Sequence, residues 1–98
     1  MIDFLKGLGI PFKEITIYER ALTHASFANE NQVEKNETLE FLGDAVIELL
    51  MSDYLYNENI KDEGTMTKRR AQAVCEEALV TYADKIDLKP HIRLGRGE

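Results

Sequence analysis

The chain has 98 residues, 44% of them hydrophobic, which suffices for one small domain with one core. Its 18 acidic and 12 basic residues give a net charge of −6, which excludes a uniformly basic nucleic-acid-binding surface. No apolar run approaches the ~20 residues that cross a bilayer, and the first residues lack a signal-peptide pattern, so we expect a cytoplasmic protein with no membrane contact. The single cysteine, Cys75, excludes an internal disulfide and is expected to be buried as a small apolar residue.

Two helices are predicted in the first third of the chain. The first covers residues 1–7 and ends where glycines and a proline follow. The second runs from residue 15 or 17 to residue 26, and a polar loop follows over residues 28–35. Four residues of this second helix recur at the spacing of one buried helix face: Tyr18, Ala21, Leu22 and Ala25.

A long central helix is predicted from Glu37 to about Tyr56, with Asn36 as its N-cap. At 100° per residue, four acids fall within a fan of about 80°: Glu37, Glu40, Asp44 and Glu48. Five aliphatic residues occupy the other side, which we expect to be the dry face: Leu39, Leu42, Val46, Leu49 and Leu50. Gly43 lies toward the apolar side, so another helix is expected to approach there.

Two further helices complete an all-α prediction for a single domain over residues 1–98. A turn is expected at residues 62–64, after which Thr65 or Thr67 caps a fourth helix that carries a basic cluster. The fifth helix spans residues 76–86. Charge is divided along the chain: 5 basic and 13 acidic residues lie in residues 1–64, against 7 and 5 in residues 65–98.

The acidic side of the central helix has two interpretations. Its like charges at i,i+3 and i,i+4 disfavour the helix by roughly 0.2–0.5 kcal/mol per pair, which a solvated acidic face tolerates. Alternatively, Glu40 and Asp44, one turn apart, are the one or two carboxylates that Mg²⁺ prefers. His24 and Ser26 lack a third residue to orient the histidine, so a cap or core hydrogen bond is expected there rather than nucleophilic catalysis.

The basic cluster at residues 68–70 is likewise either a solvated surface or a set of phosphate contacts. Three successive residues span about 200° of a helix, so they cannot all face one ligand. Spacing alone does not choose among Lys68, Arg69 and Arg70.

Three segments in order resemble the ribonuclease III family. The central one is NETLEFLGDAV at residues 36–46, with ALTHASF at 21–27 before it and EGTMTKRRA at 63–71 after it. The segment LGRGE at 94–98 resembles the glycine-rich turn that follows in the family. The resemblance implies a ribonuclease III-type helical domain that cuts double-stranded RNA by metal-assisted phosphodiester hydrolysis, as in the processing of ribosomal RNA, and that works as a homodimer.

The resemblance also assigns roles to residues of this chain. Glu40 and Asp44 would be catalytic ligands of Mg²⁺, for which Mn²⁺ substitutes. Glu37 and Glu63 correspond to acids that border the cleft, and Phe41 corresponds to an aromatic at the dimer interface. Arg70 matches a recurrent element near the core of the domain and would support nearby acids, which leaves Lys68 and Arg69 as the candidates for RNA contact.

The family completes its metal site with a second acidic pair in an Asp-x-x-Glu-Ala segment, and these 98 residues contain no such segment. The late acids Asp84 and Asp87 do not resemble it. We therefore expect the front part of a ribonuclease III catalytic domain, truncated before its last helices and without a double-stranded-RNA-binding domain. The alternatives are a non-catalytic ribonuclease III-like module for dimerisation or RNA scaffolding, and a helical protein-interaction domain.

Overall fold

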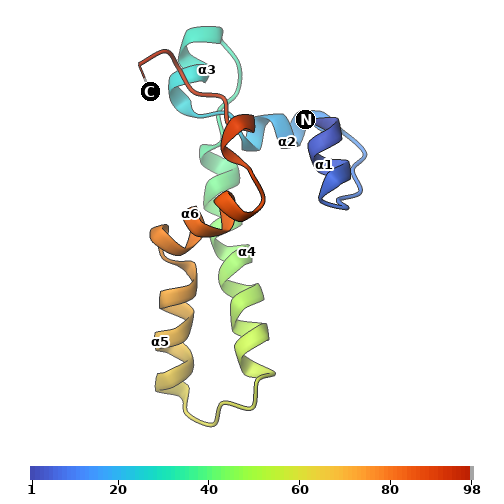
Figure 1. Cartoon of the computed structure of the whole chain (residues 1–98). Helices are drawn as coiled ribbons and strands as arrows, with labels where there is room; N and C mark the ends of the chain where they lie inside the picture. Colours follow the sequence, from blue (N-terminus) through green and yellow to red (C-terminus); the bar gives the residue numbers. More distant parts are fainter. Residues whose placement is uncertain (98) are drawn as a thin grey trace.

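The computed structural model describes residues 1–97, and within them the fold is helical, as predicted (Figure 1). Its elements in order are α1 (Ile2–Gly7), α2 (Ile15–Ala21), α3 (Ala25–Asn31), α4 (Glu37–Tyr56), α5 (Glu63–Val74), α6 (Glu76–Lys85) and a 3-10 turn η1 (Lys89–His91). Extended pairing in this part of the chain is limited to an isolated bridge between Thr23 and Arg93. None of the described helices is long and apolar enough to cross a membrane. Residue 98, the end of the glycine-rich segment, lies outside the described residues.

The molecule is elongated, with principal extents of 50 × 28 × 21 Å. The C-terminal half of α4 and the whole of α5 form an antiparallel two-helix arm, and α6 crosses beside α4 at the inner end of α5 (Figure 1). The short helices α1 to α3 and the C-terminal segment gather at the other end of α4 (Figure 1). Buried apolar side chains are few in the described residues, namely Leu5, Ala28 and Leu55.

The prediction of one helix from residue 15 to 26 is wrong. The chain leaves the helix after α2 because the C-terminal segment takes the backbone groups that would continue it. The amide of Arg93 donates to the carbonyl of Leu22 at 2.7 Å, and the amide of His24 donates to the carbonyl of Arg93 at 3.0 Å. α3 then begins at Ala25 and occupies the first residues of the predicted polar loop.

Three local predictions also need correction. Asp62 caps α5 through a 2.9 Å bond from the Thr65 amide, so residues 63 and 64 are helical rather than a turn. Asn36 precedes α4 as predicted, but its side chain donates to the carbonyl of Ala21 at 3.3 Å and caps nothing. Cys75 is exposed at the junction of α5 and α6. The fifth predicted helix is confirmed as α6.

The solvent exposure of the two sides of α4 is the reverse of the prediction. The aliphatic side is open to solvent, with Leu49 70% exposed and Leu42, Val46 and Leu50 also exposed. The acidic side faces α5, as the ion pair of Glu48 with Arg70 shows, and α6, since Glu40 and Asp44 border a hollow with Leu79. A Cβ on Gly43 would meet no atom within 4 Å, so the predicted close approach of another helix is absent from residues 1–97.

A candidate metal site on helix α4

The two outermost of the four acids on one side of α4 are paired with cations; the four are Glu37, Glu40, Asp44 and Glu48. The Glu37 carboxylate lies 3.4 Å from the ammonium nitrogen of Lys35, just before the helix begins. One carboxylate oxygen of Glu48 lies 3.2 Å from Nε of Arg70 on α5. The two outer acids therefore already have cationic partners.

The two inner acids, Glu40 and Asp44, differ from the outer ones. Within residues 1–97 neither carboxylate has an ion pair or a side-chain hydrogen bond. Both border a hollow of about 470 Å³ between α4 and α6, together with Gly43, Ile47 and Leu79. Two carboxylates one helical turn apart thus share an open space with no protein cation against them.

This donor set fits a hard divalent cation. Mg²⁺ binds oxygen ligands and commonly takes one or two carboxylates, completing its shell with waters and substrate phosphates. Groups of three or more metal-binding side chains do not occur among the described residues, so the pair is the whole protein donor set that residues 1–97 present there. Glu40 and Asp44 would hold such an ion, and the absence of a side chain at Gly43 leaves the hollow between them and Leu79 open.

Glu63 lies at a different place from the carboxylate pair. Its carboxylate accepts a 2.7 Å hydrogen bond from the Thr67 hydroxyl in the first turn of α5. It borders a smaller hollow of about 220 Å³ between α4 and α5, whose lining also includes Leu55 and Arg70. The late acids Asp84 and Asp87 do not join Glu40 and Asp44, because the described residues contain no metal-binding group of three or more side chains. Asp84 is instead bound to Lys89 at 3.1 Å.

The basic cluster of α5 divides between two uses. Arg70 binds α4 through Glu48 and through the Ser52 hydroxyl, which accepts from its guanidinium at 2.8 Å. Lys68 and Arg69 are exposed, and neither has an ion pair within residues 1–97. Phe41, beside the acids on α4, is 82% exposed.

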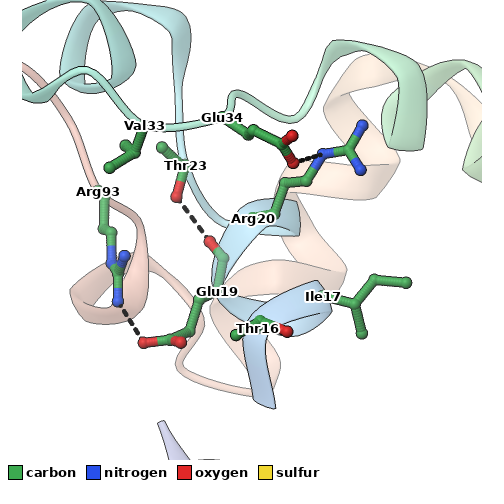
Figure 2. Close-up of a pocket in the computed structure, with 8 residues that line it drawn as sticks. All are labelled: Thr16, Ile17, Glu19, Arg20, Thr23, Val33, Glu34 and Arg93. Carbon is green, nitrogen blue, oxygen red and sulfur yellow. Dashed lines mark hydrogen bonds and ion pairs between the residues drawn. The ribbon is translucent and has the colours of Figure 1, made fainter. Parts of the chain in front are cut away.

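Sequence reasoning missed the ion pairs that fix the short helices around the start of α4 (Figure 2). Arg20 of α2 binds Glu34 at 3.5 Å and donates to Thr38 in the first turn of α4. Arg93 binds Glu19 at 2.6 Å and so holds the C-terminal segment against α2. The hollow between them measures about 340 Å³, but each of its arginines already has a carboxylate partner. These pairs join residues 14 and 74 positions apart in sequence, so no local sequence pattern predicts them.

His24 has the capping role that was expected. Its Nδ1 accepts a hydrogen bond from the amide of Ser26 at 3.1 Å and caps α3. The same nitrogen lies 2.8 Å from the Ser26 hydroxyl, which in turn accepts from the amide of Gly95 at 2.8 Å. The imidazole of His24 and the hydroxyl of Ser26 are therefore both engaged in hydrogen bonds that hold the fold together.

These features define a helical domain with a carboxylate pair suited to a divalent metal. Comparison with known proteins agrees, because the family model described as Ribonuclease-III-like matches residues 14–98. The chain belongs to the ribonuclease III family, and the resemblance seen in its sequence is confirmed.

Curated relatives that the chain resembles are named Ribonuclease 3. It is 56% identical over 97 residues to that of Phytoplasma mali, covering 96% of this chain and 43% of the relative. It is 50% identical over 100 residues to that of Staphylococcus epidermidis, covering 98% and 41%. The chain therefore spans about two fifths of the length of these relatives.

Solved structures show the same fold. The nuclease domain of ribonuclease III from Campylobacter jejuni, described for flexibility in a region involved in dimer formation, matches with a TM-score of 0.87 and 36% identity. That match covers 97% of this chain and 65% of the nuclease domain. A 2.2 Å crystal structure of the same domain also gives a TM-score of 0.87, with 35% identity.

Proposed function

We propose that this chain provides the first part of the catalytic domain of a double-stranded-RNA-specific endoribonuclease, acting in the cytoplasm on RNA such as ribosomal RNA precursors. The observation that carries the proposal is the contrast along α4: Glu40 and Asp44 are unpaired within residues 1–97, whereas the acids on either side of them are neutralised. Leaving two like charges one turn apart without partners disfavours the helix, and a bound cation removes that cost.

Glu40 and Asp44 would hold the metal, Mg²⁺ or Mn²⁺, in the hollow beside Leu79. When bound, such an ion activates a water for attack on a phosphodiester and stabilises the charge that develops on the phosphate. Glu37 and Glu63 are the auxiliary acids of the proposal, placed at the starts of α4 and α5. Glu63 has no ion pair among residues 1–97, so its negative charge attracts cations toward the start of α5, whereas the charge of Glu37 is already offset by Lys35.

RNA contact is proposed for Lys68 and Arg69. Both are exposed on α5, and no carboxylate competes for them among the described residues. Lysine and arginine supply most phosphate contacts to nucleic acids, and double-stranded RNA is recognised mainly through its A-form shape and backbone. We therefore assign these two residues to backbone contact without sequence preference.

Homodimerisation through α4 is the third part of the proposal. The aliphatic side of this helix and Phe41 are exposed, which is an unusual amount of apolar surface for one helix of a soluble domain. A second copy packed on α4 would cover Phe41 and place two carboxylate pairs along one RNA duplex. The remaining metal ligands would then come from water, from phosphate, or from a segment that corresponds to the part of the longer relatives that these 98 residues do not match.

One observation favours a second candidate, a non-catalytic module that dimerises or scaffolds RNA on the same helices. The metal-binding side chains of residues 1–97 amount to a pair, with no group of three or more. A pair holds a divalent ion weakly unless other ligands complete the shell.

The test is cleavage of a long labelled RNA duplex by the purified chain, with and without Mg²⁺. The comparison variant is Glu40→Gln/Asp44→Asn, and Asp53→Asn, which removes one charge from the opposite side of α4, is the control. Metal-dependent cutting that the double variant loses and the control keeps supports the enzyme. Duplex binding without cutting is expected both of a scaffold and of a catalytic part whose metal shell is incomplete. Joining the chain to the later part of a relative's nuclease domain decides between them, because only the catalytic part then cuts. Neither binding nor cutting, before or after the joining, overturns both.

A further inference from the structure

We propose that Arg70 limits the metal site to two carboxylates by holding Glu48 away from Glu40 and Asp44. This inference rests on the proposed metal binding at that pair. It gives Arg70 a positioning role that sets which cation the site selects.

The geometry fixes Arg70 to α4 at two levels one helical turn apart. Its Nε lies 3.2 Å from the Glu48 carboxylate. Its Nη1 donates to the Ser52 hydroxyl at 2.8 Å, and that hydroxyl donates to the Glu48 carbonyl at 2.7 Å. Arginine suits this task because its planar, permanently charged fork presents several donors in fixed directions.

Glu48 would otherwise extend the metal site. It follows Asp44 by four residues, as Asp44 follows Glu40, so the three side chains form one row on α4 with about 40° between neighbours. While Glu48 is paired with Arg70 it does not line the hollow. A free Glu48, one turn from Asp44, would bring a third carboxylate and a third negative charge toward it. Since Mg²⁺ keeps several waters and few carboxylates, while Ca²⁺ takes six to eight oxygens, the third acid would favour the larger ion.

The ion pair alone is a modest restraint, because the Arg70 and Glu48 side chains are 41% and 43% exposed. Exposed pairs contribute little by themselves. The Ser52 contact is what makes the restraint specific, since it fixes the guanidinium whether or not Glu48 is engaged. The guanidinium of Arg70 is thereby held beside Glu48 before the ion pair forms.

The experiment is calorimetric titration of the full 98-residue chain with Mn²⁺ and with Ca²⁺. For Arg70→Gln we expect Ca²⁺ binding tightened by roughly fivefold or more, and by a larger factor than Mn²⁺ binding, because a freed carboxylate adds negative charge near the ion. Adding Glu48→Gln to this variant should restore the wild-type affinities. Arg70→Lys keeps the charge but loses the planar fork that engages Glu48 and Ser52 together, so its Ca²⁺ affinity should lie between those of the wild-type chain and Arg70→Gln. Circular dichroism verifies that each variant is folded.

Glu48→Gln alone gives a second, independent test on a half-exposed residue. If Glu48 is held away by Arg70, this variant binds Mn²⁺ as the wild-type chain does. A loss of affinity as large as that of Glu40→Gln would make Glu48 a ligand and overturn the inference. An Arg70→Gln affinity equal to or weaker than wild type would also overturn it. Failure of the proposed metal site itself is distinguished by the wild-type chain, which would then bind no more Mn²⁺ than Glu40→Gln/Asp44→Asn.

Discussion

The amide nitrogen of Gly95 lies 2.8 Å from the hydroxyl oxygen of Ser26, so the C-terminal turn rests directly on the first residues of α3. The neighbouring amide of Arg96 donates to the Glu30 carboxylate at 3.1 Å. α3 is thus held by a segment almost 70 residues later in the chain. The closeness of the two backbones leaves no room for a side chain at Gly95.

Gly95→Ala should therefore lower the free energy of unfolding. The added Cβ would meet the Glu30 carboxylate and two atoms of Ser26 at 2.9 Å, one of them backbone, so the turn must shift away. Overpacking of this kind costs roughly 1–3 kcal/mol. Urea unfolding followed by circular dichroism measures the change. Gly97→Ala is the matched control, because a Cβ there meets nothing within 4 Å; equal losses in both variants would contradict the explanation.

The Asp62 cap predicts a pH dependence at the start of α5. Hydrogen bonds from the Thr65 hydroxyl and amide lower the pKa of Asp62 below its usual 3.8. Because the folded pKa is depressed, the stabilisation is present above pH 3.8 and is lost as pH falls through the folded value. The stability advantage of the wild-type chain over Asp62→Asn should shrink between about pH 5 and pH 2 in thermal unfolding. An advantage that is constant over this range would rule out the cap as its source.

The long central helix was predictable because its signals are local. The bounds of α4 match the sequence prediction, as do those of α6 within a residue, since strong helix formers and periodic apolar positions specify them. The break between α2 and α3 was not predictable in this way. It depends on backbone bonds from Arg93, a residue far along the chain, and the local pattern of residues 15–26 favours one continuous helix.

The candidate site also combines features that local sequence predicts with features that depend on distant residues. Spacing alone places Glu40 and Asp44 on one side of a helix, but it also places Glu37 and Glu48 there. Glu37 is paired with its sequence neighbour Lys35, but only the tertiary position of Arg70 separates Glu48 from the unpaired acids. Periodicity also identifies an aliphatic side without saying what covers it, which is why the solvent exposure of Leu49 contradicts the expectation of a dry face.

The buried hydroxyl of Thr23 provides a third prediction. This side chain is 1% exposed and donates to the Glu19 carbonyl at 2.6 Å. Thr23→Val keeps the shape and removes the bond, so we expect a loss of roughly 0.5–1.5 kcal/mol in the free energy of unfolding. Thr81→Val is the control, since Thr81 makes the same i to i−4 bond to Glu77 at 3.1 Å on an exposed surface. A larger loss for Thr81→Val in urea unfolding would count against the role of burial.

The last prediction concerns self-association through α4. Phe41 is 82% exposed in the single chain, so Phe41→Ala should leave the unfolding transition of the monomer unchanged. If a second copy covers Phe41, truncating this aromatic should weaken dimerisation by roughly tenfold or more, as for a central interface residue. Sedimentation equilibrium over a range of micromolar concentrations measures both species. Tyr56→Ala, at the far end of α4 and 75% exposed, is the matched control. Dimerisation that is equally sensitive to both variants, or to neither, would contradict an interface centred on Phe41.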